Sequence, residues 1–128
     1  MKPPPPSEET EQKIVVNWLR AKGVLFSATA NGARMSWKQA KKLKSTGCSK
    51  GLVDLLIFDR PTHEVLVGSI IDSRPAGIAI EMKRRNSVPS AVSPEQREWL
   101  DALEQRGWLV KVAKGAIDAI QFLEGVGL

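Results

Sequence analysis

Three residue types that many enzymes rely on are scarce or missing in this chain of 128 residues. It contains one cysteine, Cys48, one histidine, His63, and no tyrosine. A single thiol excludes an intrachain disulfide, and one thiol with one imidazole cannot build a thiolate or imidazole cage for zinc. The lack of tyrosine excludes enzymes that attack DNA through a tyrosine nucleophile. The groups left for chemistry are carboxylates, lysines, serines and metal ions bound through oxygen.

Long apolar runs are also missing. No stretch approaches the roughly 18 apolar residues that cross a bilayer, and residues 1–6 lack the apolar segment of a secretory signal. We therefore expect a cytoplasmic protein without a membrane partner. The length fits one domain of common size, so we predict a disordered, proline-rich leader at residues 1–6 and a single domain at residues 7–128.

Acidic residues are absent between Glu11 and Asp54, although this segment holds nine lysines and arginines. The whole chain has a net charge of +5. A charge run is usually a solvated face, but so many cations without a carboxylate to pair with favour a polyanion such as DNA. Trp37, at the head of a basic helix, is the aromatic residue best placed to touch it. The cations expected to bind DNA are Arg34, Lys38, Lys41, Lys42, Lys44, Lys50, Arg84 and Arg85.

Apolar periodicity and end signals predict the element order α-β-α-β-β-β-α-β-α. Three of the predicted helices begin after serines that can cap them, namely Ser7, Ser36 and Ser93, and the fourth covers residues 116–123. The predicted strands cover residues 24–28, 52–58, 64–71, 77–83 and 108–113. This order predicts an α/β fold, a mixed central β-sheet with helices packed against it.

Two of the predicted strands carry charges at positions that should be buried. Asp54 interrupts the apolar run 52–58, where an unpaired carboxylate would be costly to desolvate. Glu81 and Lys83 lie on either side of Met82, and the two-residue period of a strand puts both charged side chains on one face. An isolated Glu-x-Lys sequence is most often a simple ion pair, so the inference depends on the combination with Asp54.

That combination supplies what phosphodiester hydrolysis needs. The carboxylates of Asp54 and Glu81, with the main-chain carbonyl of Met82, can hold Mg²⁺ or Mn²⁺, which prefer oxygen ligands. The metal would lower the pKa of a bound water, and Lys83 could orient or activate that water. The sequence therefore predicts a metal-dependent hydrolase that needs no histidine.

This D…E-x-K pattern resembles the PD-(D/E)xK nucleases, and further motifs narrow the resemblance to the VRR-NUC family, over about Ser7 to Leu123. The sequence departs from the family pattern in two places, and neither is a proposed ligand. Val53 stands where the family often has proline, and the interval from Asp54 to Glu81 is long. We expect residues 60–76 to form an elongated hairpin within it. The motifs occur in the family's order: Asn31-Gly32, Lys44-Ser-Thr-Gly47, Gly51-Leu-Val-Asp54, Glu81-Met-Lys83-Arg84, Ser93-Pro-Glu-Gln96 and Gly107-Trp-Leu-Val110.

The resemblance implies a restriction-endonuclease-like core and a particular set of site residues. Its site combines a glutamate of the first helix, the aspartate, the E-x-K pair and a glutamine that opens a later helix. We favour Glu8 for the first of these, with Glu11 as the alternative. A capping box also explains Gln96, and the two roles are compatible. The implied catalytic residues are Glu8, Asp54, Glu81, Lys83 and Gln96, with Asp54, Glu81 and the Met82 carbonyl as metal ligands.

The resemblance also implies a function. We expect a standalone DNA endonuclease of the phage or bacterial type that depends on Mg²⁺ or Mn²⁺. We expect it to act as a homodimer on branched DNA such as four-way junctions. The alternative is a non-catalytic DNA-binding module of the same fold, a partner in a repair or replication complex. The intact set of Asp54, Glu81 and Lys83 counts against that alternative.

Overall fold

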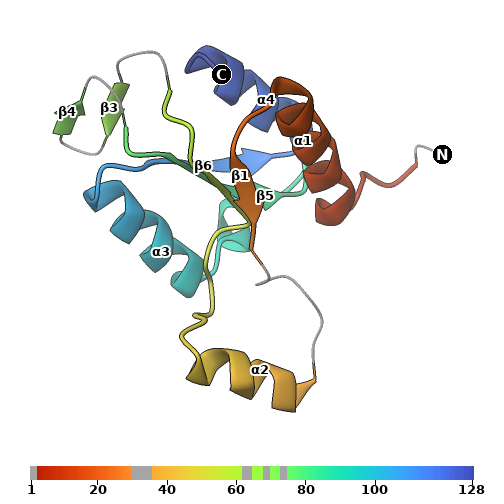
Figure 1. Ribbon diagram of the computed structural model, residues 1–128. Helices are drawn as coiled ribbons and strands as arrows, with labels where there is room; N and C mark the ends of the chain where they lie inside the picture. The colour runs from red at the N-terminus through yellow and green to blue at the C-terminus, as the bar shows by residue number, and fades with distance from the viewer. Residues whose placement is uncertain (1–2, 30–35, 62–64, 68–69, 73–74) are drawn as a thin grey trace.

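A mixed four-stranded sheet forms the centre of the protein (Figure 1). The computed structural model describes all residues except 1–2, 30–35, 62–64, 68–69 and 73–74. Strands β1, β2 and β5 pair antiparallel, whereas β5 and β6 pair parallel, which confirms the predicted mixed sheet. In spatial order the strands are β1 (Phe26–Ala28), β2 (Leu55–Ile57), β5 (Ile78–Lys83) and β6 (Leu109–Lys114).

Helices cover both faces of this sheet and create two apolar clusters. On one face, α1 (Glu8–Lys22) and α4 (Ala116–Gly125) pack together over β2 and β5. On the other face, α3 (Pro94–Gln105) packs through Leu100 against β5 and β6. The remaining α-helix, α2 (Trp37–Ser45), stands away from the sheet in Figure 1, and a short 3₁₀ helix covers Pro89–Ala91.

The serine caps predicted for three helices are confirmed. Ser7, Ser36 and Ser93 each accept a hydrogen bond from the main-chain N–H three residues later, which satisfies one of the free donors of the first turn. In α2 and α3 the residue at that third position is a glutamine that bonds back to the serine N–H and completes a capping box.

Strand β5 is buried along its whole length, and its side chains alternate between the two clusters. Ile78, Ile80 and Met82 belong to the cluster under α1 and α4, and Ala79 belongs to the cluster under α3. Glu81 and Lys83 follow Ala79 at two-residue spacing and therefore lie on the α3 side of the sheet. The predicted one-sided placement of this charged pair is confirmed.

The prediction of one continuous strand over residues 64–71 is wrong, because the structure has two strands in this region. Strands β3 (Val65–Val67) and β4 (Ile70–Asp72) pair antiparallel in a separate two-stranded sheet, which confirms the expected hairpin and adds one strand to the predicted order. The Gly68-Ser69 pair between them is typical of a tight hairpin connection, a signal that the continuous apolar pattern obscured. At the base of the hairpin, Nε of Arg60 donates to the carbonyl of Pro75 at 2.7 Å.

Some sequence predictions fall outside the described residues. Asn31-Gly32 and Arg34 belong to this group. In the part of the chain that the structure describes, no helix combines the length and the apolar character needed to span a membrane.

Candidate active site

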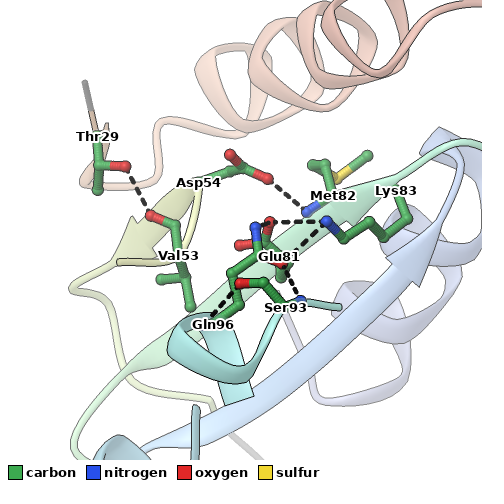
Figure 2. A network of polar contacts seen from close by, with 8 residues as sticks. All are labelled: Thr29, Val53, Asp54, Glu81, Met82, Lys83, Ser93 and Gln96. Carbon is green, nitrogen blue, oxygen red and sulfur yellow. Dashed lines mark hydrogen bonds and ion pairs between the residues drawn. The ribbon is translucent and has the colours of Figure 1, made fainter. Parts of the chain in front are cut away.

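Asp54 stands beside the carboxyl-terminal end of β5, beyond the point where its pairing with β2 stops. The pairing of β2 with β5 ends at Leu55 and Ile80, so the last residues of β5 extend past β2. There Oδ2 of Asp54 accepts a hydrogen bond from the N–H of Met82 at 2.7 Å (Figure 2). The side chain thus takes the place of a ladder partner, which explains why the strand predicted to include Asp54 begins only at Leu55.

The main chain on either side of this carboxylate is held by Thr29, just after β1. The Oγ1 of Thr29 donates to the carbonyl of Val53 at 2.7 Å, and its N–H donates to the carbonyl of Asp54 at 2.9 Å. Figure 2 shows the contact between Thr29 and Val53 to the left of the Asp54 carboxylate. The aspartate is therefore fixed from both its side chain and its backbone.

Gln96 connects the two charged residues of β5. Its Nε2 donates to Oε1 of Glu81 at 2.8 Å, and its Oε1 accepts from Nζ of Lys83 at 3.1 Å. The same Oε1 accepts from the N–H of Ser93 at 2.9 Å, so a single amide serves the capping box and the site (Figure 2). The amide that closes the capping box therefore also contacts both charged residues of β5.

The carboxyl groups of Asp54 and Glu81 share one cation of the cluster, Lys83. Nζ of Lys83 lies 3.5 Å from Oε1 of Glu81, and both side chains are almost completely buried. Burial and the charge of Asp54 nevertheless raise the pKa of Glu81 to about 8. Burial also raises the pKa of Asp54, against the hydrogen bond from Met82 and the charge of Lys83. One cation is therefore insufficient to keep both carboxylates charged.

One buried atom of the cluster lacks a partner. Oε2 of Glu81 has no hydrogen-bond partner among the described residues, although an unsatisfied buried carboxylate oxygen is costly. No group of three or more histidine, cysteine or acidic side chains in the described part could bind a metal ion. Side-chain ligands for a cation would therefore come from Asp54 and Glu81 alone. Two carboxylates are sufficient for Mg²⁺, which usually keeps several waters.

The first-helix glutamates make no hydrogen bond or ion pair with this cluster among the described residues. Glu8 is exposed. Glu11 is fully buried. Its Oε1 accepts from Arg85 at 2.7 Å, and its Oε2 accepts from the N–H of Ala116 at 3.2 Å.

Glu11 therefore connects α1 to the first turn of α4, a role that the sequence analysis missed. Its burial was detectable, because Glu11, Val15 and Leu19 follow one another at intervals of four residues and share a face of α1. Gly115 leaves room for it, since a Cβ at that position would collide with the carboxylate of Glu11.

The cations predicted to bind DNA fall into two groups. Arg84 and Arg85 are engaged within the chain: Arg84 donates to the carbonyls of Pro5 and Pro6, and Arg85 pairs with Glu11. Lys50 forms an exposed ion pair with Glu95 at 3.6 Å. The other group lies on exposed positions of α2: Lys38, Lys41, Lys42 and Lys44.

Comparison with known proteins agrees with the geometry. The VRR-NUC domain family profile matches residues 6–117. A solved structure described as a VRR_NUC domain protein superposes with a TM-score of 0.61 at 22% identity, over 96% of this chain and 89% of that chain. No curated protein matches the chain. The similar structure supports the mixed sheet flanked by helices, and the matched segment includes all the residues of the cluster. The chain therefore belongs to the VRR-NUC domain family, whose members have a nuclease-like PD-(D/E)xK fold and are generally nucleases.

Proposed function

We propose that the protein is a metal-dependent DNA endonuclease that hydrolyses phosphodiester bonds at the cluster of Asp54, Glu81 and Lys83. The observation that carries this proposal is the buried, unpartnered Oε2 of Glu81 beside the partly buried carboxylate of Asp54. Without a cation, such an arrangement either costs free energy or takes up a proton, in line with the raised pKa of Glu81. A site for a divalent cation explains why the chain keeps it.

The residues present fit Mg²⁺ or Mn²⁺. Asp54 and Glu81 would supply carboxylate oxygens. The N–H of Met82 points toward Asp54, and the C=O of a strand residue points to the same edge as its N–H, so the Met82 carbonyl suits a third ligand. The metal, when bound, would withdraw charge from a phosphate oxygen and lower the pKa of a water.

In this proposal Lys83 orients the attacking water and stabilises the charge on the phosphate. Its ammonium group is buried and held by Gln96 and Glu81, so it can reach a reacting group without reorganising. From this position it would orient the water and stabilise the negative charge that develops on the phosphate oxygens. Gln96 touches both charged side chains and acts as a positioning residue.

We further propose that the substrate is branched DNA, such as a four-way junction, and that the active form is a homodimer. The net charge of +5 and the lysines of α2 support a polyanionic substrate. Resolution of a junction requires two symmetric nicks, and one chain offers one such cluster. A closed twofold dimer would present two copies of it.

The experiment that tests the proposal uses labelled linear, flapped and four-way DNAs with Mg²⁺, Mn²⁺ or EDTA. We expect cleavage only with a divalent metal, and no cleavage by Asp54→Asn, Glu81→Gln or Lys83→Ala. DNA affinity measured in EDTA should be nearly unchanged in these variants, because the substitutions act on the metal and the water. Turnover like that of the wild type in the two carboxylate variants would contradict the proposed metal site. Tight binding without cleavage under any condition would favour the non-catalytic module.

A further inference from the structure

Helix α2 is stabilised by its own ends and not by burial. Its capping box joins Ser36 to Gln39, and Thr46 closes its carboxyl end with hydrogen bonds to the last turn. None of its residues is buried, and in Figure 1 it stands off the body of the protein. A helix of nine residues gains little stability without tertiary packing. We therefore expect the exposed side chains of α2 to have a function.

Trp37, in the first turn of α2, exposes an indole ring to solvent. Its relative exposure is 75%, against 66% for Ile117 and 64% for Leu25, the next most exposed large apolar residues in the described part of the chain. The ammonium group of Lys41 lies 5.1 Å from the centre of the ring, a cation–π geometry. The indole is thus oriented by its own helix while much of its surface is left open.

The chain on both sides of α2 is fixed at the candidate active site. Thr29 precedes it and is bonded to the carbonyls of Val53 and Asp54. Gly51 follows it and lies so close to α3 that a Cβ would be 2.7 Å from main-chain and side-chain atoms of Glu95. We call residues 36–53, which include α2 and the loop after it, the basic arm. A ligand bound by the basic arm is therefore held by a segment whose main chain leads directly to Asp54.

The charge of the basic arm indicates which kind of partner binds to it. Its lysines have no acidic residue beside them in the arm, which is suited to the phosphates of DNA and repels a basic surface. Within an intact duplex the faces of the bases are hidden in the stack, whereas an unpaired base along the strand offers a π-face to an indole. The lysines are Lys38, Lys41, Lys42, Lys44 and Lys50.

We infer that Trp37 stacks on an unpaired base of DNA whose phosphates are held by the lysines of the basic arm. The protein would then distinguish DNA with unpaired bases, at a branch point or a single-stranded flank, from uninterrupted duplex. This inference rests on the part of the proposed function that makes DNA the substrate. It does not require cleavage, so it can fail or succeed independently of the metal site.

The test measures binding in EDTA to a blunt duplex and to the same duplex with an oligothymidine flank. We expect Trp37→Ala to lose roughly 5- to 150-fold in affinity for the flanked DNA, equivalent to the ~1–3 kcal/mol of one base stacked on an aromatic ring. Affinity for the blunt duplex should be unchanged. Trp37→Phe should retain part of the preference, and Leu25→Ala, which truncates another exposed apolar residue, should retain all of it.

Two further measurements identify the stacking partner. Binding of oligothymidine should quench tryptophan fluorescence in the wild type and much less in Trp37→Phe. Lys38→Ala with Lys42→Ala should weaken binding to both DNAs alike and flatten the salt dependence. Equal losses on both DNAs in Trp37→Ala, or a dimer that dissociates in this variant without a change in DNA preference, would overturn the inference. No DNA binding by the wild type would instead refute the proposed function.

Discussion

At the scale of a single residue, Glu81 shows how the proposed metal site conflicts with stability. Its carboxyl group is buried next to that of Asp54, and together these features raise its pKa from 4.5 to about 8. Below pH 4.5 the group is neutral in the folded and the unfolded chain. Between these two values the unfolded chain gives up the proton while the folded chain keeps it, so the free energy of unfolding falls as pH rises.

Glu81→Gln should therefore stabilise the metal-free protein increasingly as pH rises from 4.5 to 8. The amide carries no charge, so the repulsion from Asp54 and the cost of burying a carboxylate both disappear. Urea unfolding in EDTA at pH 5 and pH 8 measures the gain, with Glu124→Gln at an exposed position as the control. Mg²⁺ or Mn²⁺ should stabilise the wild type and have much less effect on the variant. Equal pH dependence in all three proteins would contradict the raised pKa.

Gln96 and Gln39 allow the capping role to be separated from the role in the site. Both glutamines close a capping box, but only Gln96 also contacts Glu81 and Lys83. Gln96→Ala should lower turnover at saturating DNA by about 10- to 100-fold, as expected for a residue that orients other site groups. Gln39→Ala should lose a similar cap with unchanged turnover. Gln96→Glu should keep the cap and still lose turnover, because it adds a third carboxylate.

If Gln96→Glu cleaved DNA at the wild-type rate, the amide contacts would have no part in the reaction. A lower affinity with unchanged turnover at saturation would likewise place Gln96 in DNA binding and not in the positioning of Lys83.

At the scale of elements, local signals were sufficient for the helices and insufficient for the ends of the strands. Ser7, Ser36 and Ser93 were predictable as caps because a cap depends on residues three positions apart. The start of β2 was not, because it depends on Asp54 bonding to Met82, a contact between distant segments. The same limit applies to Glu11, whose partners Arg85 and Ala116 are supplied by the tertiary fold.

The cluster itself was predictable in part. Asp54, Glu81 and Lys83 stood out because a charge within an apolar strand needs a partner, and the structure brings all three together. The one-sided alternation of β5 follows from strand geometry alone. The bridging amide of Gln96 could be named but not oriented, since its direction depends on how α3 packs against the sheet.

Gly51 shows how one loop position controls the contact between the basic arm and α3. Its φ of +87° favours glycine, and an added Cβ would be 2.7 Å from the carbonyl carbon and Cβ of Glu95. Gly51→Ala should lower the free energy of unfolding by about 1–3 kcal/mol and reduce cleavage, because Gln96 follows directly. Gly47→Ala, at φ +108° with no atom within 4 Å, should show only the smaller backbone cost. Equal effects of the two substitutions on cleavage would show that the contact does not position Gln96.

On the scale of the whole molecule, the β3–β4 hairpin is the element that we consider for the interface of the proposed homodimer. The β3–β4 hairpin forms its own two-stranded sheet beside the four-stranded one. A two-stranded hairpin alone is only marginally stable in water. Its sequence is largely apolar, and Arg60 closes its base by bonding to Pro75. In the proposed homodimer, a second copy of the chain would stabilise such an element and supply a second cluster of Asp54, Glu81 and Lys83.

We predict that the β3–β4 hairpin forms the dimer interface and that junction resolution requires the dimer. The wild type should sediment at twice the chain mass of 14.0 kDa and cut a four-way junction symmetrically on two strands. Replacing residues 62–74 with a short glycine–serine linker from Pro61 to Pro75 should give a monomer, since these ends are already held together by the Arg60 contact. That monomer should still nick DNA, because the linker lies outside the cluster of Asp54, Glu81 and Lys83. A monomeric wild type, or a hairpin-free variant that still resolves junctions with paired nicks, would contradict the prediction while leaving the proposed chemistry of the single site intact.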